Sequence, residues 1–139
     1  DGMRQSVFSE LKDIAEHVAA AHGASAVAQV PDNEGQNYPV TINDPALTAR
    51  MLPSLENVAG TGNVVDPGLT MGAEDFSMYA RQAPGMFFFV GATPVGQDAA
   101  NAPSNHSDKF YVDESALDLG LRALLQVSLD YLNGAAPAR

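Results

Sequence analysis

The run of five apolar residues at Met86–Val90 constrains the fold of this 139-residue chain more than any other segment. A strand with one face in water alternates apolar and polar residues, whereas this run has no polar position. It therefore predicts a central strand covered on both faces by helices, as in an open α/β sheet. Ligands of such sheets gather beyond the carboxyl ends of the strands. The long loop from Gly91 to Lys109 leaves that end if the strand is parallel to its neighbours, and its length is typical of a functional loop.

The remaining segments predict helices and further short strands. In chain order we expect an amphipathic helix closed by His22-Gly23, a strand at 24–30, a polar turn at 31–37, an extended segment at 38–42, a helix at 44–58, a short strand at 64–65, a loop and short helix at 72–83, and a last helix that begins at Asp113 or Ser115 and ends at Gly134. Asp44 as N-cap before Pro45 is a strong helix start. Pro53 should kink or divide that helix, which Gly60 ends. The leucines of the last helix are in register on one face.

Charge and composition exclude several classes of protein. Seventeen acidic residues against seven basic ones give a net charge of −10, so we expect no nucleic-acid partner, since phosphate binding needs clustered Lys and Arg. The absence of cysteine excludes disulfides, thiolate metal sites and a cysteine nucleophile. Met86–Val90 is far too short to cross a bilayer, so we expect no membrane partner. The chain begins at Asp1 and enters a helical pattern almost at once, so we expect a truncated or processed product.

The three histidines differ in their predicted surroundings. His17 and His22 lie on a predicted helix away from its apolar stripe, so we expect solvated side chains. His106 lies in the long loop, where an imidazole could bind a metal or carry a proton. A lone loop histidine is nevertheless more often an ordinary surface residue, and a metal site in this chain would need Asp and Glu as further ligands.

Two acidic pairs are candidates for function. Asp113-Glu114 stands at a predicted helix start, where capping explains acidic residues well. Glu74-Asp75 follows Gly72-Ala73, and the pair could either begin a helix or order an active-site loop. Signatures of serine acyl hydrolases, P-loops and dinucleotide-binding folds do not occur.

Three motifs together resemble the C-terminal part of the zinc-dependent aminoacylase and carboxypeptidase family. They are Gly72-Ala73-Glu74-Asp75-Phe76-Ser77, Ala83-Pro84-Gly85 with the apolar run up to Gly91, and Asn105-His106-Ser107-Asp108-Lys109-Phe110-Tyr111-Val112-Asp113-Glu114. The chain is most similar to the amidohydrolase branch that includes hippurate hydrolase and indole-acetyl-amino-acid hydrolases, which the upstream segment from Tyr38 to Pro45 also fits. The resemblance spans nearly the whole chain.

The resemblance implies an α/β fold: the closing segment of a zinc-peptidase-like catalytic domain, residues 44–139, preceded by the end of an α+β lid domain, residues 1–43, that also mediates dimerisation. It implies that His106 is the last metal ligand of a two-metal site that holds Zn, with Mn or Co as alternatives. Asn43, Glu74 and Asp75 would be substrate-binding residues. No catalytic residue is expected in this chain, because the general-base glutamate and the other metal ligands of the family precede the matched segment.

The implied activity is metal-dependent hydrolysis of the amide bond of an N-acyl amino acid or a small peptide, by a homodimer. It would require the N-terminal half, so we expect the isolated chain to be inactive. An alternative is a non-catalytic remnant that acts as an interaction or dimerisation module. The compartment stays open between cytoplasm and periplasm, because an address would lie further towards the N-terminus.

Overall fold

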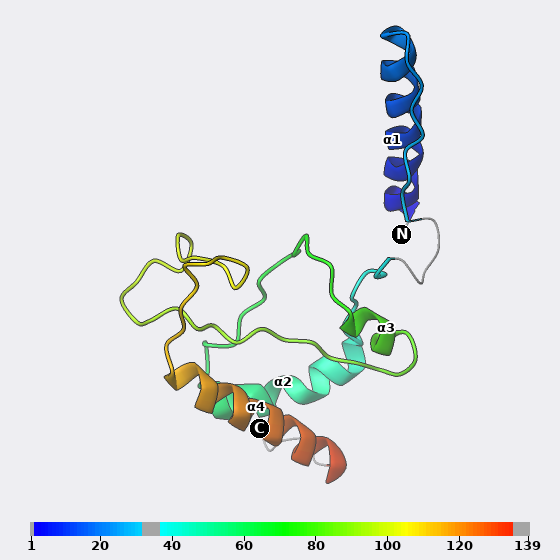
Figure 1. Ribbon diagram of the computed structural model, residues 1–139. Coiled ribbons are helices and arrows are strands. Elements are labelled where there is room, and N and C mark those ends of the chain that lie inside the picture. Colours follow the sequence, from blue (N-terminus) through cyan, green and yellow to red (C-terminus); the bar gives the residue numbers. More distant parts are fainter. Residues whose placement is uncertain (1, 32–36, 135–139) are drawn as a thin grey trace. The chain divides into compact units, whose positions relative to one another are not determined.

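The computed structural model describes residues 2–31 and 37–134, so most of the predicted turn at 31–37 lies outside the described residues. This part of the chain contains α1 (Gly2–Ala21), α2 (Pro45–Ala59), α3 (Phe76–Ala80) and α4 (Ser115–Leu132) (Figure 1). None of these helices is both long enough and apolar enough to cross a membrane.

Local sequence explains where α2 begins and ends, as predicted. The Asp44 carboxylate accepts a hydrogen bond of 2.7 Å from the Leu47 N–H, and Pro45 occupies the first turn, where its missing donor costs nothing. Gly60 ends the helix at φ +91°, a backbone angle that favours glycine. Pro53 lies inside one continuous helix, so of the two predicted effects it does not divide α2. Its neighbours Met51, Ser54 and Leu55 are buried, and this packing stabilises the helix through the proline.

The other helices also agree with the sequence in position. Gly23 follows α1 at φ +69°, and Gly134 follows α4 at φ +67°. The Asp113 carboxylate accepts hydrogen bonds from the Ser115 N–H at 2.9 Å and the Ser115 hydroxyl at 2.6 Å, which fixes the start of α4. A loop precedes the short α3, as the pattern of residues 72–83 predicts.

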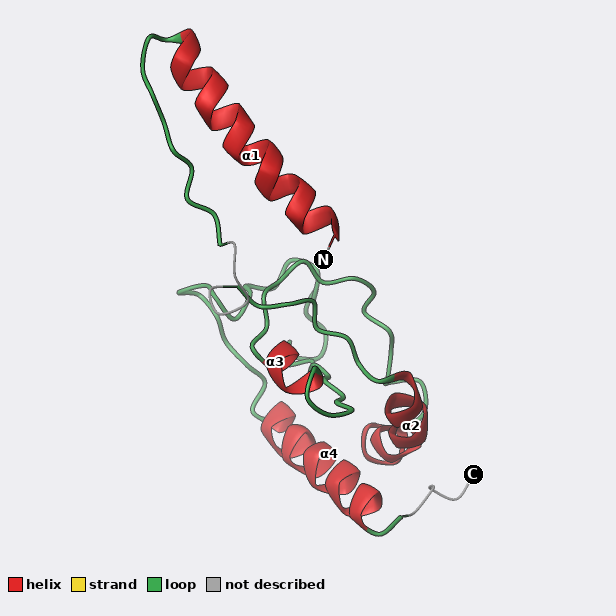
Figure 2. Ribbon diagram, turned by 90° about the vertical axis from the view of Figure 1, so that its right-hand side faces the viewer, coloured by secondary structure: helices red, strands yellow, loops and turns green. Residues whose placement is uncertain are grey.

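No strand forms within residues 2–31 and 37–134, which corrects the strands predicted at 24–30, 64–65 and 86–90 (Figure 2). A strand requires backbone hydrogen bonds to a neighbouring strand, and the apolar segment 86–90 finds none in this part of the chain. Its side chains are not covered on both faces either, because Phe89 is 65% exposed. The segment has the apolar pattern of a strand, but the described residues supply no neighbouring strand with which it could pair.

Two compact units divide the chain. One contains the described residues up to Ile42 together with Met71–Ala83, and therefore α1 and α3. The other contains Asn43–Thr70 and the described residues from Pro84 onward, and therefore α2 and α4.

The core of the second unit lies where α2 packs on α4 (Figure 1). Met51 is fully buried there and Leu55 nearly so, while α4 contributes the small side chains of Ala116 and Ala123. With Pro39 of the other unit, these are the buried apolar side chains among the described residues. A Cβ added to Gly120 would lie 3.6 Å from a methyl group of Val90, so segment 86–90 ends against α4.

The leucine face of α4 is exposed, although an apolar stripe of this kind normally faces a core. We use this name for Leu117, Leu121, Leu124, Leu125, Leu129 and Leu132, each of which is more than half exposed. Small residues on the opposite side of the helix allow close approach to α2, which leaves the leucines without a covering element among the described residues.

Candidate functional site

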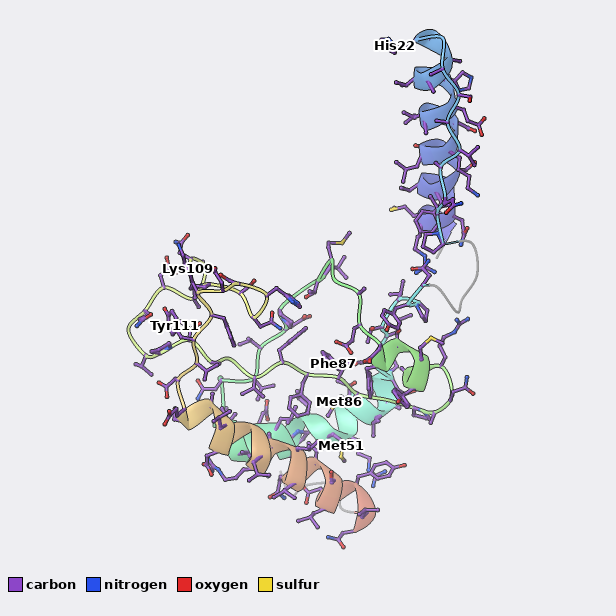
Figure 3. The ribbon with its side chains drawn as sticks, in the orientation of Figure 1. His22, Met51, Met86, Phe87, Lys109 and Tyr111 are labelled. Carbon is purple, nitrogen blue, oxygen red and sulfur yellow. The ribbon has the colours of Figure 1, made fainter. Side chains whose placement is uncertain are left out.

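The loop that carries His106 is closed at its base by backbone and side-chain hydrogen bonds. The Asp113 N–H donates to the Ala92 carbonyl at 2.8 Å, which joins the two ends of the loop. The Tyr111 hydroxyl donates to the Gln97 side-chain oxygen, which ties the two sides together further along. Figure 3 labels Tyr111 and Lys109 on this loop, beyond the α2 and α4 pair. The loop therefore has a fixed base and an open end.

A series of tight turns presents His106 to solvent. The Ser107 N–H donates to the Ser104 carbonyl at 2.9 Å, and the Phe110 N–H donates to the Ser107 carbonyl at 3.1 Å. The His106 N–H makes a long contact of 3.4 Å to the Ser104 hydroxyl. The imidazole itself is exposed and makes no hydrogen bond to any described residue. Its ring nitrogens are therefore available to an external ligand.

A complete metal site is not assembled by the described residues. No group of three or more His, Asp and Glu side chains lies close enough within residues 2–31 and 37–134 to hold a metal ion. A catalytic zinc ion needs about three protein ligands, so His106 could supply one of them and the others must come from elsewhere. The donor chemistry is suitable, but the donor set is incomplete.

Asn43 is bonded through both ends of its amide to one residue, Phe87. The Asn43 amide nitrogen donates to the Phe87 carbonyl and the Asn43 side-chain oxygen accepts from the Phe87 N–H, each at 2.8 Å. The same unit holds Asn43 and His106. Asn43 thus contacts the segment that leads into the loop.

Glu74 and Asp75 belong to the other unit, directly before α3. The Glu74 carboxylate accepts a hydrogen bond from the Phe76 N–H at 3.1 Å, and the Glu74 backbone carbonyl accepts one from the Ser77 hydroxyl at 2.6 Å. Asp75 is exposed and its side chain does not cap the helix. Glu74 therefore stabilises its own turn, whereas the Asp75 carboxylate makes no capping hydrogen bond to α3.

The remaining candidates have structural explanations. Asp113 lies just before Glu114, the N-cap residue of α4, and its hydrogen bonds to the Ser115 hydroxyl and N–H hold the pKa of its carboxyl below the ordinary value, more than burial raises it. The His17 Nδ1 lies 2.6 Å from the Asp13 carbonyl one turn earlier, and both His17 and His22 are exposed on or beside α1.

A polar cluster between α2 and α4 was not predicted. The fully buried Ser54 hydroxyl donates to Asp130 at 2.7 Å, and the Gln126 amide donates to both Asp130 oxygens at 3.0 Å. These bonds, with Gln126 contributing most and Ser54 next, lower the pKa of Asp130. Nearby, Arg50 donates to the Tyr131 carbonyl and lies 5.0 Å from the Tyr131 ring centroid. The spacing of Gln126 and Asp130 on one helix face could have indicated part of this cluster, whereas nothing in the sequence indicates Ser54.

Residues 12–130 match the model of peptidase family M20/M25/M40. Among curated relatives, the chain is 33% identical over 131 residues to "IAA-amino acid hydrolase ILR1-like 4" of Arabidopsis thaliana, covering 90% of this chain and 29% of that protein. It is 29% identical over 133 residues to "Thermostable carboxypeptidase 2" of Saccharolobus solfataricus, covering 96% and 32%. The chain thus spans about a third of the length of the relatives it matches. No solved structure is significantly similar to it.

Proposed function

The chain belongs to peptidase family M20/M25/M40, which confirms the resemblance seen in its motifs, and on this premise we propose that it is part of an enzyme that hydrolyses amide bonds. The substrate class that its motifs favour is an N-acyl amino acid or a small peptide. The observation that carries the proposal is that the match over residues 12–130 includes the exposed His106 in a loop with a fixed base. Membership also supports an α/β peptidase-like fold, in which segment 86–90 would pair with strands outside this chain.

We assign His106 the role of a metal ligand in the complete enzyme. Zinc fits an imidazole combined with carboxylates, and Mn or Co would also be accepted by such a set. The described residues assemble no further ligands, so the other ligands of a two-metal site, and the general base, belong to the rest of the protein. When bound, the metals would activate water and polarise the scissile carbonyl. This chain's part is to present one imidazole at the open end of an anchored loop.

Glu74, Asp75 and Asn43 are the proposed substrate-binding residues. The exposed Asp75 carboxylate is available to a ligand, and Glu74 shapes the turn that presents it. Asn43 uses one amide hydrogen and its carbonyl oxygen on Phe87, which leaves its second amide hydrogen for a substrate group. Residues 1–43 are proposed as the end of a lid domain through which the enzyme forms a homodimer, and residues 44–139 as the end of the catalytic domain.

The small core supports a chain that functions together with further polypeptide. A domain of about 150 residues normally buries roughly two thirds of the surface of its unfolded chain. Here the buried apolar side chains among the described residues come to five, while the leucine face of α4 is exposed. The rest of a family-sized protein would cover such a surface, and we therefore expect the isolated chain to be inactive.

The same exposed face favours a second candidate function. A contiguous apolar helix face is typical of an interaction surface, so a non-catalytic interaction or dimerisation module is the alternative. Neither candidate needs nucleic acid or a membrane. We keep both cytoplasm and periplasm as proposed locations.

The test compares His106→Ala with His22→Ala in the full-length protein, assayed for bound metal and for hydrolysis of an N-acyl amino acid. Both histidines are exposed, so the folding cost of either change should be small. We expect His106→Ala to lose metal and to lower kcat/KM by roughly 100-fold or more, while His22→Ala matches the wild type. Normal metal content and turnover in His106→Ala would remove His106 from the site. A wild-type protein that holds metal ions but hydrolyses no amide would favour the alternative, a non-catalytic interaction or dimerisation module.

A further inference from the structure

Hydrogen bonds tie together the two places where the chain enters the unit of α2 and α4. The chain enters this unit at Asn43 and again at Pro84. Directly after these points, the Asp44 N–H donates to the Gly85 carbonyl at 2.8 Å, and the Asn43 amide pairs with the N–H and carbonyl of Phe87. We call these three hydrogen bonds the entry clamp. It joins residues about 40 positions apart, so it is a tertiary contact and not a local turn.

The side chain of Asn43 does what a neighbouring strand would do. It offers one donor and one acceptor to the two backbone groups of a single residue, which is the pairing of a hydrogen-bonded position in an antiparallel ladder. Of the side chains with this length, only asparagine supplies both groups in a neutral amide. Leaving the backbone groups of Phe87 without partners would be costly, because Phe87 is half-buried. The clamp thus satisfies an extended segment that lacks strand neighbours among the described residues.

Contacts continue from the clamp to the loop of His106. Three residues beyond Phe87, Val90 lies against Gly120 of α4. Two residues further, the Ala92 carbonyl accepts the Asp113 N–H that closes the base of the loop. Each end of the loop is therefore held by α4 or by the segment that Asn43 fixes.

We propose that Asn43 is a positioning residue for the loop that carries His106, acting through the backbone of Phe87. The inference rests on the proposed function, since it concerns the same site. The role adds to the substrate contact proposed for the second amide hydrogen of Asn43. Positioning alters the stability of the loop base and the rate of the chemical step, whereas a contact made equally in the ground state and the transition state alters KM alone.

The test uses hydrogen–deuterium exchange on the full-length protein, with Asn43→Ala and the matched control Asn57→Ala. Asn57 is exposed on α2 and makes no hydrogen bond to the 86–90 segment. We expect Asn43→Ala to speed exchange of the Phe87 and Asp113 amides at least about tenfold, because the hydrogen bonds of both N–H groups depend on the clamp. Asn57→Ala should leave both unchanged. Faster exchange at Phe87 with no change at Asp113 would overturn the proposal, since the clamp would then be local.

Kinetics of N-acyl amino acid hydrolysis supply the second measurement. Positioning predicts a lower kcat in Asn43→Ala, with or without a rise in KM from the lost substrate contact. A rise in KM at constant kcat would leave Asn43 as a substrate contact alone and overturn the proposal. If Asn43→Ala does not fold, Asn43→Asp replaces it, because the carboxylate still accepts from the Phe87 N–H and loses only the donor. Exchange in this variant should rise less than tenfold but still at both amides. A wild type without hydrolase activity would refute the proposed function, while the exchange data would still decide the role of Asn43.

Discussion

The α2 and α4 pair and the loop of His106 lie in one unit but are held by different kinds of interaction. The pair is joined by contacts between distant residues, such as the Ser54 to Asp130 hydrogen bond across 76 positions and the burial of Met51. Between its closed ends, the loop is held mainly by turns of two or three residues around Ser104 and Ser107. The difference separates a scaffold from the segment it carries, which is how functional loops are usually built. It also predicts that the two regions respond to different mutations.

The largest effect on the scaffold is expected from Met51→Ala. Met51 lies at the contact of α2 with α4 (Figure 3), and its side chain is fully buried, with an exposure of 0%. Truncation of such a side chain costs about 2–5 kcal/mol through lost burial and the cavity that remains. Exchange of the amides of α2 and α4 in the full-length protein should accelerate accordingly.

Leu121→Ala provides the matched control on α4. Leu121 is 59% exposed, so its truncation should cost well under half as much if the leucine face is open in the complete protein. Equal losses for Met51→Ala and Leu121→Ala would show that another part of the protein covers the leucine face. The pair of variants therefore also distinguishes an open interaction surface from a covered one.

A smaller effect is expected from Asp44→Ala. This change removes the acceptor for the Leu47 N–H at the start of α2 and should cost about 0.5–2 kcal/mol, seen as faster exchange in the first turn of α2. Asp44→Asn keeps a capping oxygen and should behave like the wild type. The Asp44 backbone bond to Gly85 does not involve the side chain, so the loop of His106 should be insensitive to both variants. Faster exchange at the loop base in Asp44→Ala would mean that the two regions are coupled through the cap.

The helices could be predicted because their ends depend on interactions between residues close in sequence. Strand pairing and burial could not, because they depend on contacts between distant segments. The cap at Asp44, the end at Gly60 and the start near Asp113 all depend on residues within four positions, so the pattern of the sequence is sufficient for them. Segment 86–90 has the composition of a covered strand, but pairing depends on neighbours that the described residues do not supply. Which face of α4 is buried could not be predicted for a related reason. Its small residues, and not its leucines, meet α2, and periodicity cannot tell which of two apolar faces is covered first.

The candidate site divides in the same way. The motif around His106 predicts a metal ligand, which stays a prediction, and the structure adds that the ring is exposed on an anchored loop. The clamp between Asn43 and Phe87 joins two motifs 44 positions apart, so no local pattern could predict it. Glu74 and Asp75 were found by their motif, and their role as substrate-binding residues stays a prediction.

The smallest expected effects concern acid, and they treat the two regions separately. Asp113 at the loop base and Asp130 on α4 both have a pKa below the ordinary value of 3.8. A carboxyl whose pKa is lower in the folded state contributes stability above its unfolded pKa, and this contribution is lost as the pH falls through the folded value. The stability of both regions should therefore be insensitive to pH between 5 and 7, where both carboxyls are ionised in the folded and unfolded states. It should fall once the pH drops below about 3.8.

Two variants should shift these titrations one at a time, measured by the carboxyl carbon chemical shifts in NMR spectra. Ser115→Ala removes the largest cause of the shift at Asp113 and should raise its pKa, leaving Asp130 unchanged. Gln126→Ala removes the largest cause at Asp130 and should raise that pKa, leaving Asp113 unchanged. Because each carboxyl is bonded to a different set of donors, a change in both pKa values from either variant would contradict the separation of loop base and scaffold. The separation matters for the proposed enzyme, since it allows the position of His106 to vary without unfolding the helices that carry its loop.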